Sequence, residues 1–164
     1  MDLRILKEVN DLWSKIYPYL AAQVSEYYGK NHGDVLELGP FAGGISIELA
    51  RLHHRLSITL AAQDSGVVDF LQKEIEGARL NQKMELTCSE LDNLVFADSV
   101  FDLVIFRGAY FFLDEEGKIL REIYRVLKEE GLAFIGGRRA RRSEALRFRQ
   151  DGWLRHHPQR GDGR

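Results

Sequence analysis

Apolar and polar positions follow one another along this chain in a pattern that predicts strands and helices in alternation. Short apolar runs, typical of buried strands, are followed by segments with apolar residues every three or four positions, typical of helices. The predicted strands are residues 35–38, 56–61, 84–88, 101–106 and 132–135, and the predicted helices between them are 43–53, 66–80 and 115–129. Such alternation with short connections favours right-handed crossovers and a parallel sheet.

The chain before the first predicted strand also has helical spacing. Residues 3–28 carry an apolar stripe of Ile5, Val9, Leu12 and Ile16 before Pro18 interrupts it. We therefore expect three parts: an N-terminal helical cap (1–33), an α/β core (34–137) and a tail (138–164). The core is predicted to be doubly wound and Rossmann-like, with about five mostly parallel strands and helices on both faces.

Length and composition favour one globular domain. The chain has 164 residues, of which 45% are hydrophobic and 29% are charged, and these shares are ordinary for a folded domain. No apolar run is long enough to cross a bilayer, and the N-terminal residues are too charged for a signal peptide. Cys88 is the only cysteine, which argues against a disulfide framework or a thiolate metal site. We expect a cytoplasmic protein without a metal.

The tail differs in composition from the rest of the chain. Residues 138–164 hold nine arginines and three acidic residues, a formal charge of +6, which leaves −8 for residues 1–137. Three interpretations remain open: a basic appendage for nucleic acid or an acidic partner, a partly disordered extension, or a frame-shifted end. The last two are favoured over nucleic-acid binding. A short helix over 143–150 is expected.

The richest motif is DVLELGPFAGG, residues 34–44, where a strand runs into a glycine-rich turn before a helix. Gly39 and Gly43 let the backbone approach a ligand closely. A dinucleotide-binding turn needs a glycine where Phe41 stands, so a nicotinamide-dependent oxidoreductase is disfavoured. Glu37, two residues before the first glycine, instead suits the ammonium group of S-adenosylmethionine.

Three ordered blocks resemble class I S-adenosylmethionine-dependent methyltransferases of the group that acts on small molecules, lipids and quinones. The turn matches the family's acid-x-G-x-G-x-G motif except at Phe41, and SVFDLVIFRGAYFFL and EIYRVLKEEGLAFIGG resemble later blocks over residues 34–137. The resemblance implies a cofactor site that includes Glu37, Gly39, Pro40, Phe41 and Gly43. Family members usually continue with a helix and an antiparallel strand pair, which we expect this chain to lack.

The same resemblance predicts the remaining cofactor contacts. The acid for the ribose falls on Asp64 or on Gln63, and Asp64 could equally cap the following helix. The acid for the adenine falls on Glu90, with Asp92 as its rival, and Leu91 supplies a backbone amide and an apolar contact. A capping acid in a helical turn is the other interpretation of this segment.

Residues after the fourth predicted strand are expected to face the substrate. Arg107 could hold the cofactor or an acidic substrate group, and Tyr110 and Phe111 could wall an apolar pocket, although aromatic residues in such runs are often core. No catalytic residue is assigned, because methyl transfer from an activated sulfonium needs positioning first and a base only for some acceptors. His32, His53 and His54 are the candidate bases.

The function that this sequence predicts is methyl transfer from S-adenosylmethionine to a small-molecule or lipid-like acceptor. A catalytically silent S-adenosylmethionine-binding or interaction module on the same fold is the alternative. If the final strands are missing, a sheet edge is exposed, and a homodimer is then an expected arrangement.

Overall fold

The computed structural model describes residues 2–107, 116–136 and 144–147. Its strands are β1 (His32–Leu38), β2 (Arg55–Ala62), β3 (Met84–Cys88), β4 (Phe101–Arg107), β5 (Leu127–Gly136) and β6 (Glu144–Arg147). They form one sheet in the order β3-β2-β1-β4-β5-β6, in which the first five are parallel and β6 is antiparallel to β5. This confirms the predicted α/β, doubly wound, Rossmann-like fold.

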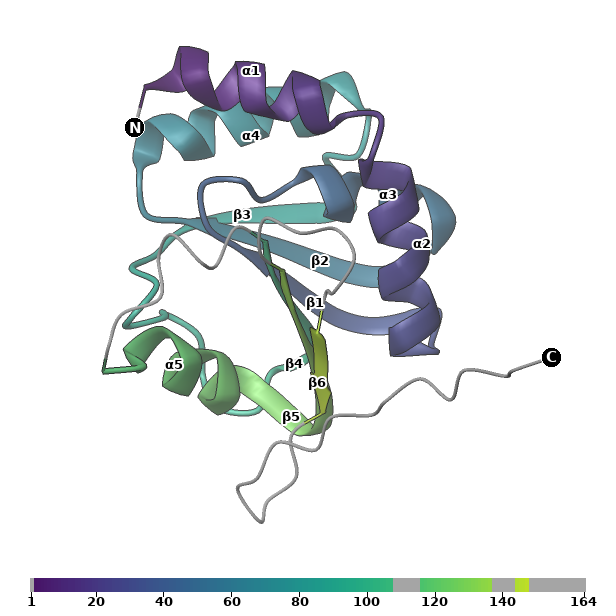
Figure 1. Ribbon diagram of the computed structural model, residues 1–164, viewed down its shortest axis with the longest axis vertical. Helices are drawn as coiled ribbons and strands as arrows, with labels where there is room; N and C mark the ends of the chain where they lie inside the picture. The colour runs from purple at the N-terminus through teal and green to yellow at the C-terminus, as the bar shows by residue number, and fades with distance from the viewer. Residues whose placement is uncertain (1, 108–115, 137–143, 148–164) are drawn as a thin grey trace, which may run out of the picture.

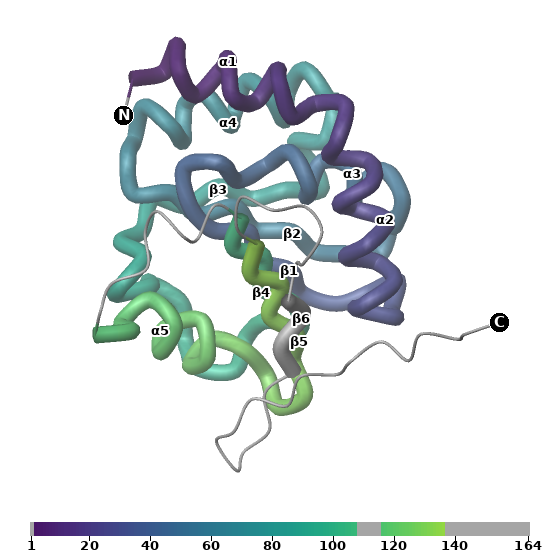
Figure 2. Tube along the Cα trace, viewed as in Figure 1, coloured from purple at the N-terminus to yellow at the C-terminus, as the bar shows by residue number. Residues whose placement is uncertain are grey.

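The helices are α1 (Leu3–Trp13), α2 (Tyr17–Tyr28), α3 (Gly44–Leu52), α4 (Ser65–Gly77) and α5 (Lys118–Val126). Figure 1 shows α1 running along α4 on one side of the sheet, with α5 on the other side. The chain trace in Figure 2 follows α1 directly into α2, which packs beside α3. The N-terminal helices therefore cover the same face of the sheet as the helix that follows the glycine turn.

Alternate residues of the strands feed two separate cores, because successive side chains in a strand point to opposite faces. Under α1 to α4, the core includes Val35, Ile58, Leu103 and Phe134. Under α5, it includes Leu36, Val104, Phe106 and Ala133. Both faces of the sheet are thus buried against helices, as the near-continuous apolar runs of the strands predict.

The ion pairs at the amino-terminal edge of the sheet tie three strands together. Nζ of Lys128 lies 2.8 Å from Oδ2 of Asp34 and 2.8 Å from Oδ2 of Asp102. The backbone amide of Asp34 also donates to Asp102 at 3.0 Å. Asp102, which follows Phe101 at the start of β4, therefore serves the structure of this edge.

Three details differ from the sequence-based prediction. The stripe on α1 lies largely in solvent, with Ile5 57% and Leu12 75% exposed, and Leu6 is the buried residue of that helix. Helix α5 ends at Val126, because Leu127 already pairs with β4 as the first residue of β5. The expected helix over 143–150 is wrong at residues 144–147, which form β6 instead.

The predictions for Tyr110 and Phe111, and most of those for the tail, concern residues 108–115, 137–143 and 148–164, which lie outside the described residues. The division into a cap, a core and a tail stays a prediction. Its first boundary falls inside a strand, because β1 begins at His32.

Candidate functional site

The turn between β1 and α3 has backbone conformations that require glycine. Gly39 has a φ of +95°, and a Cβ there would lie 3.1 Å from Cε2 of Phe106. Gly43 has a φ of +102°, and a Cβ there would lie 2.9 Å from Cδ2 of Leu71. Side chains at either position would meet both backbone strain and a close neighbour. The glycines therefore fold the chain tightly at the carboxyl end of β1.

Glu37 is completely buried at the end of β1, which is unusual for a carboxylate. Its Oε2 accepts a hydrogen bond of 3.0 Å from the backbone amide of Ser46, in the first turn of α3. Its Oε1 is equally buried and has no hydrogen-bond partner among the described residues. Burial raises the pKa of the carboxyl group, while the bond from Ser46 and the charge of Arg107 act in the opposite direction.

Arg107 is the last residue of β4, the strand beside β1. Its guanidinium carbon lies 4.0 Å from the centre of the Trp13 ring and 5.0 Å from the centre of the Tyr17 ring. Its Nη1 is buried without a hydrogen-bond partner in the part of the chain that the structure describes. Among the described residues, the cation is thus held by aromatic side chains rather than by an acidic one, and Tyr17 also makes a polar contact with it.

The register of the sheet explains why Glu37 and Arg107 meet. Glu37 is paired with Ile105 across β1 and β4, and Ile105 belongs to the core under α1 to α4. Arg107 follows Ile105 by two positions and so projects from the same face of β4. A carboxylate and a guanidinium, each with a buried atom that has no partner among the described residues, therefore share one face and one edge of the sheet.

The next predicted residues lie at the same edge, after β2 and β3. Oδ1 of Asp64 accepts from the backbone amides of Gly66 at 2.8 Å and Val67 at 3.4 Å, so Asp64 caps α4. Nε2 of Gln63 donates to Oε2 of Glu90 at 2.6 Å, and both side chains are exposed. The structure thus brings Gln63 and Glu90 together, and the capping interpretation of Asp64 is confirmed.

The segment between β3 and β4, which we call loop 89–100, is fastened to α5. Leu91 is buried in the core under α5, and the backbone amide of Leu94 donates to Oε2 of Glu122 at 2.7 Å. The guanidinium of Arg125 donates to the backbone oxygens of Leu94 at 2.9 Å and Phe96 at 2.8 Å. These anchors hold Glu90 in place at the sheet edge.

The candidate bases lie elsewhere. His32 is the first residue of β1, and His53 and His54 lie between the end of α3 and the start of β2. In a parallel sheet, the start of each strand is at the edge opposite to Glu37 and Arg107. In addition, Nε2 of His53 is 2.8 Å from Oγ of Ser25. None of the three histidines lies at the candidate site.

Sequence reasoning missed the aromatic pair above Arg107. Tyr17 is buried, and its hydroxyl donates to Oδ1 of Asn10, which ties α2 to α1. A Cβ added at Gly44 would lie only 2.3 Å from Cζ of Tyr17, so this ring rests directly on the start of α3. The aromatic residues of the N-terminal helices were visible in the sequence, but nothing local related them to β4.

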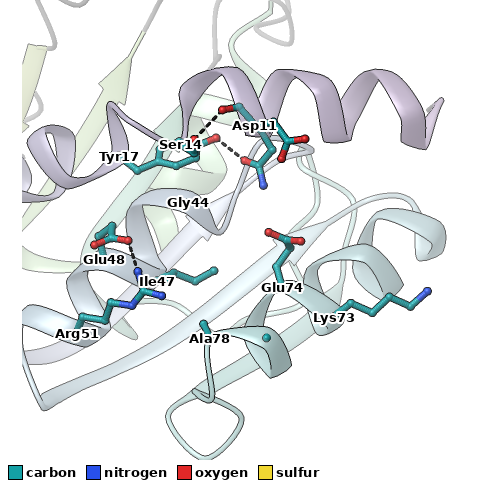
Figure 3. A pocket seen from close by; sticks show the side chains of 12 residues that line it. Asp11, Ser14, Tyr17, Gly44, Ile47, Glu48, Arg51, Lys73, Glu74 and Ala78 are labelled. Carbon is teal, nitrogen blue, oxygen red and sulfur yellow. Dashed lines mark hydrogen bonds and ion pairs between the residues drawn. The ribbon is translucent and has the colours of Figure 1, made fainter.

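A separate cavity of about 310 Å³ lies between α1, α3 and α4 (Figure 3). Tyr17 and Gly44 line it, together with charged side chains that include Asp11, Arg51 and Glu74. None of the residues predicted to bind the cofactor lines this cavity. We therefore place the candidate site at the sheet edge around Glu37 rather than here.

Within the described residues, no three histidine, cysteine or acidic side chains are grouped so that they could hold a metal ion. Among the helices that the structure describes, none has the length and apolar character needed to span a membrane.

Comparisons with known proteins agree with this geometry. A family model described as a methyltransferase domain matches residues 36–135, well over half of the chain. Demethylmenaquinone methyltransferase of Lactobacillus johnsonii is 25% identical, over 76% of this chain and 58% of its own length. The chain thus spans somewhat more than half of that curated relative.

Solved structures show the same relationship. A structure from Methanococcus maripaludis, described as a candidate S-adenosyl-L-methionine-dependent methyltransferase, is 30% identical with a TM-score of 0.74, over 82% of this chain and 61% of that one. An S-adenosylmethionine-dependent methyltransferase from Aquifex aeolicus shares the fold. It is 20% identical, with a TM-score of 0.70, over 82% of this chain and 72% of that one. This protein belongs to the methyltransferase-domain family, the class I S-adenosylmethionine-dependent methyltransferases that its sequence motifs resemble.

Proposed function

We propose that this protein binds S-adenosylmethionine at the carboxyl edge of β1, β2 and β4 and transfers its methyl group to a small-molecule or lipid-like acceptor. The observation that carries the proposal is the buried carboxyl group of Glu37, whose Oε1 has no partner among the described residues. A buried carboxylate with one unpartnered oxygen is costly for a fold. A cationic ligand group beside it, such as the cofactor's ammonium, removes that cost.

The remaining residues of the edge match the rest of the cofactor. The turn from Gly39 through Pro40 and Phe41 to Gly43 presents backbone to the amino-acid part. Gln63 or Asp64 is assigned to the ribose hydroxyls, and Glu90 with the backbone of Leu91 to the adenine. One oxygen of the Asp64 carboxylate already caps α4, since Oδ1 accepts a hydrogen bond from the backbone amide of Gly66. Gln63 and Glu90, which contact each other at 2.6 Å, would bridge ribose and adenine.

The bound cofactor would supply an activated methyl group on a sulfonium. The chain's own contribution is to hold both reactants in line and to keep water away, which can account for most of the rate. No described side chain is assigned as a base. An acceptor that is already a nucleophile at neutral pH needs no such base.

The acceptor class rests on the relatives. The curated relative is named for demethylmenaquinone, and this name supports a quinone-like or lipid-like acceptor for this chain. The match covers 58% of that protein, so the proposed acceptor class rests on the similarity of this matched part.

Titration calorimetry of the full chain with S-adenosylhomocysteine and S-adenosylmethionine tests the proposal. We expect binding of both ligands with a dissociation constant in the micromolar range, and Glu37→Ala should weaken it at least about tenfold. No binding at millimolar ligand would refute the cofactor assignment. Binding without transfer of a labelled methyl group to quinone or lipid acceptors would support the silent binding module instead.

A further inference from the structure

We propose that Arg107 binds the carboxylate of the cofactor's amino-acid end, and that Trp13 and Tyr17 of the N-terminal helices hold its guanidinium in position for that contact. This inference rests on the proposed cofactor site and deepens it. It decides between the two roles that the sequence leaves open for Arg107, contact with the cofactor and contact with an acidic acceptor.

Arg107 has one unpaired nitrogen. Nη1 of Arg107 is buried and has no hydrogen-bond partner among the described residues. A guanidinium has five N–H donors, and leaving one of them buried and unpaired costs free energy. An oxyanion in the plane of the guanidinium satisfies such a donor, and a carboxylate does so with two oxygens at once.

Two aromatic rings hold the guanidinium of Arg107. Its central carbon is 4.0 Å from the centre of the Trp13 ring and 5.0 Å from that of Tyr17. Aromatic rings attract a guanidinium through its faces, so they do not compete for the N–H groups on its edge. The two rings fix the position of the cation, and the side chain of Tyr17 also makes a polar contact with it. Among the described residues, Nη1 is left without a partner and is the donor that a ligand can use.

The neighbouring Glu37 distinguishes between the cofactor and an acidic acceptor as the ligand of Arg107. Glu37 is completely buried on the same face of the sheet, its Oε1 is unpartnered among the described residues, and its pKa responds to the charge of Arg107. A simple acidic acceptor placed on Arg107 would meet the like charge of Glu37. An α-amino acid brings an ammonium for Glu37 together with a carboxylate for Arg107. The pair therefore fits a zwitterion better than an anion.

The arrangement gives the N-terminal helices a role in cofactor binding. Trp13 ends α1 and Tyr17 begins α2, and the Tyr17 ring also rests on Gly44, next to the glycine turn. These two helices therefore reach Arg107 and the turn together. Their contribution to the site is to restrain Arg107, which is a positioning role.

The test compares two ligands that differ in one group. S-adenosylhomocysteine has the amino-acid carboxylate, and its decarboxylated analogue, S-adenosyl-3-thiopropylamine, lacks it. In titration calorimetry, we expect the native protein to bind S-adenosylhomocysteine about 10- to 100-fold more tightly than the analogue, the effect of charge-assisted hydrogen bonds. Arg107→Gln should remove this preference, because it should lower the affinity for S-adenosylhomocysteine and leave the affinity for the analogue unchanged. Equal affinities in the native protein would overturn the inference.

Two further variants guard against a general loss of structure. Arg51→Gln removes an exposed arginine of α3 that pairs with Glu48, and it should keep the native preference. Trp13→Leu keeps the arginine and removes its stacking partner, and it should reduce the preference about 3- to 10-fold. If Arg107→Gln lowers the affinity for both ligands equally, Arg107 does not bind the carboxylate and the inference is wrong.

The outcomes separate this inference from the proposed function. If the native protein binds neither ligand, the cofactor assignment itself fails. If it binds S-adenosylhomocysteine and the Arg107→Gln variant keeps the same preference, the cofactor assignment stands and the carboxylate role of Arg107 is refuted.

Discussion

The backbone amide of Ser46 donates to Oε2 of Glu37 over 3.0 Å, which joins the end of β1 to the first turn of α3. The amide is one of the donors that a helix leaves unpaired at its N-terminus, and the helix dipole favours a negative charge there. Only one of the two carboxylate oxygens is satisfied in this way, since Oε1 has no partner in the described part of the chain. This half-satisfied carboxylate is the central element of the proposed site.

Glu37→Gln is expected to stabilise the ligand-free protein and to impair ligand binding. A glutamine keeps an oxygen for the amide of Ser46 but removes a buried charge, so the free energy of unfolding should rise by about 0.5–2 kcal/mol. Denaturant unfolding measures this change, and calorimetry should show at least about tenfold weaker S-adenosylhomocysteine binding. Glu85→Gln, on an exposed position of β3, is the control and should change neither quantity.

The affinity for S-adenosylhomocysteine is expected to depend on pH through Glu37. Burial raises the pKa of this carboxyl group, and the proposed ammonium contact needs the ionised form. Affinity should therefore increase as pH rises through the raised pKa and then level off, with release of protons on binding. Calorimetry over a series of pH values above the ordinary glutamate pKa of about 4.3 checks this. A flat profile in the native protein, or the same slope in Glu37→Gln, would contradict it.

Arg125→Met is expected to loosen loop 89–100. Arg125 donates to the backbone oxygens of Leu94 and Phe96 and pairs with Glu122, so its loss leaves several polar groups of the loop unsatisfied. We expect a loss of about 1–3 kcal/mol in unfolding free energy. Because the loop carries Glu90, S-adenosylhomocysteine should also bind more weakly.

The matched control for this change is Arg121→Met, on an exposed position of the same helix. It should alter stability by no more than about 0.5 kcal/mol. Amide hydrogen exchange of loop 89–100 should accelerate in Arg125→Met and stay unchanged in Arg121→Met. Similar exchange rates in the two variants would show that Arg125 does not hold the loop.

Gly44→Ala is expected to disturb the contact between α2 and α3. A Cβ at Gly44 would lie 2.3 Å from the ring of Tyr17, so the ring must move, and we expect a cost of about 1–3 kcal/mol. In a Tyr17→Ala background the same change should cost much less, which a double-mutant cycle measures. Gly77→Ala, where no atom lies within 4 Å of the added Cβ, is the control. Equal effects of the two glycine changes would contradict the packing.

Lys128→Met is expected to lower stability without affecting ligand binding, because Lys128 lies at the amino-terminal edge of the sheet. It contacts Asp34 and Asp102, and the partial exposure of these groups limits the expected loss to about 1 kcal/mol at neutral pH. Although burial of Asp102 acts in the opposite direction, hydrogen bonds from Lys128 and the Asp34 amide hold its pKa below the ordinary value.

The pH dependence of that loss follows from the lowered pKa. The stabilisation is complete above the ordinary aspartate pKa of about 4 and disappears as pH falls through the lower folded value. Unfolding curves of the native protein and of Lys128→Met should therefore converge in acid. Lys73→Met, on an exposed part of α4, should show no such convergence. A change in S-adenosylhomocysteine affinity in Lys128→Met would contradict the separation of the two edges.

Local patterns determined most of the fold. The alternation of apolar runs and helical spacing predicted the five parallel strands and the helices between them, because the periods of 2 and 3.6 residues are properties of each segment. The glycine turn was also predictable, since Gly39 and Gly43 adopt backbone conformations that other residues rarely take. The strand β6 was not, because its position depends on pairing with β5 rather than on its own periodicity.

The charged and aromatic contacts of the candidate site were decided by tertiary structure. The sequence alone determined that Glu37 ends a strand before a glycine turn, and it identified Arg107 at the end of another. Only the packed sheet set them on one face, and only the packing of α1 and α2 brought Trp13 and Tyr17 onto the guanidinium. The physical reason is sequence distance. Contacts between residues some ninety positions apart form when two elements are buried against a common core, and no local period along the chain encodes which of their side chains will meet.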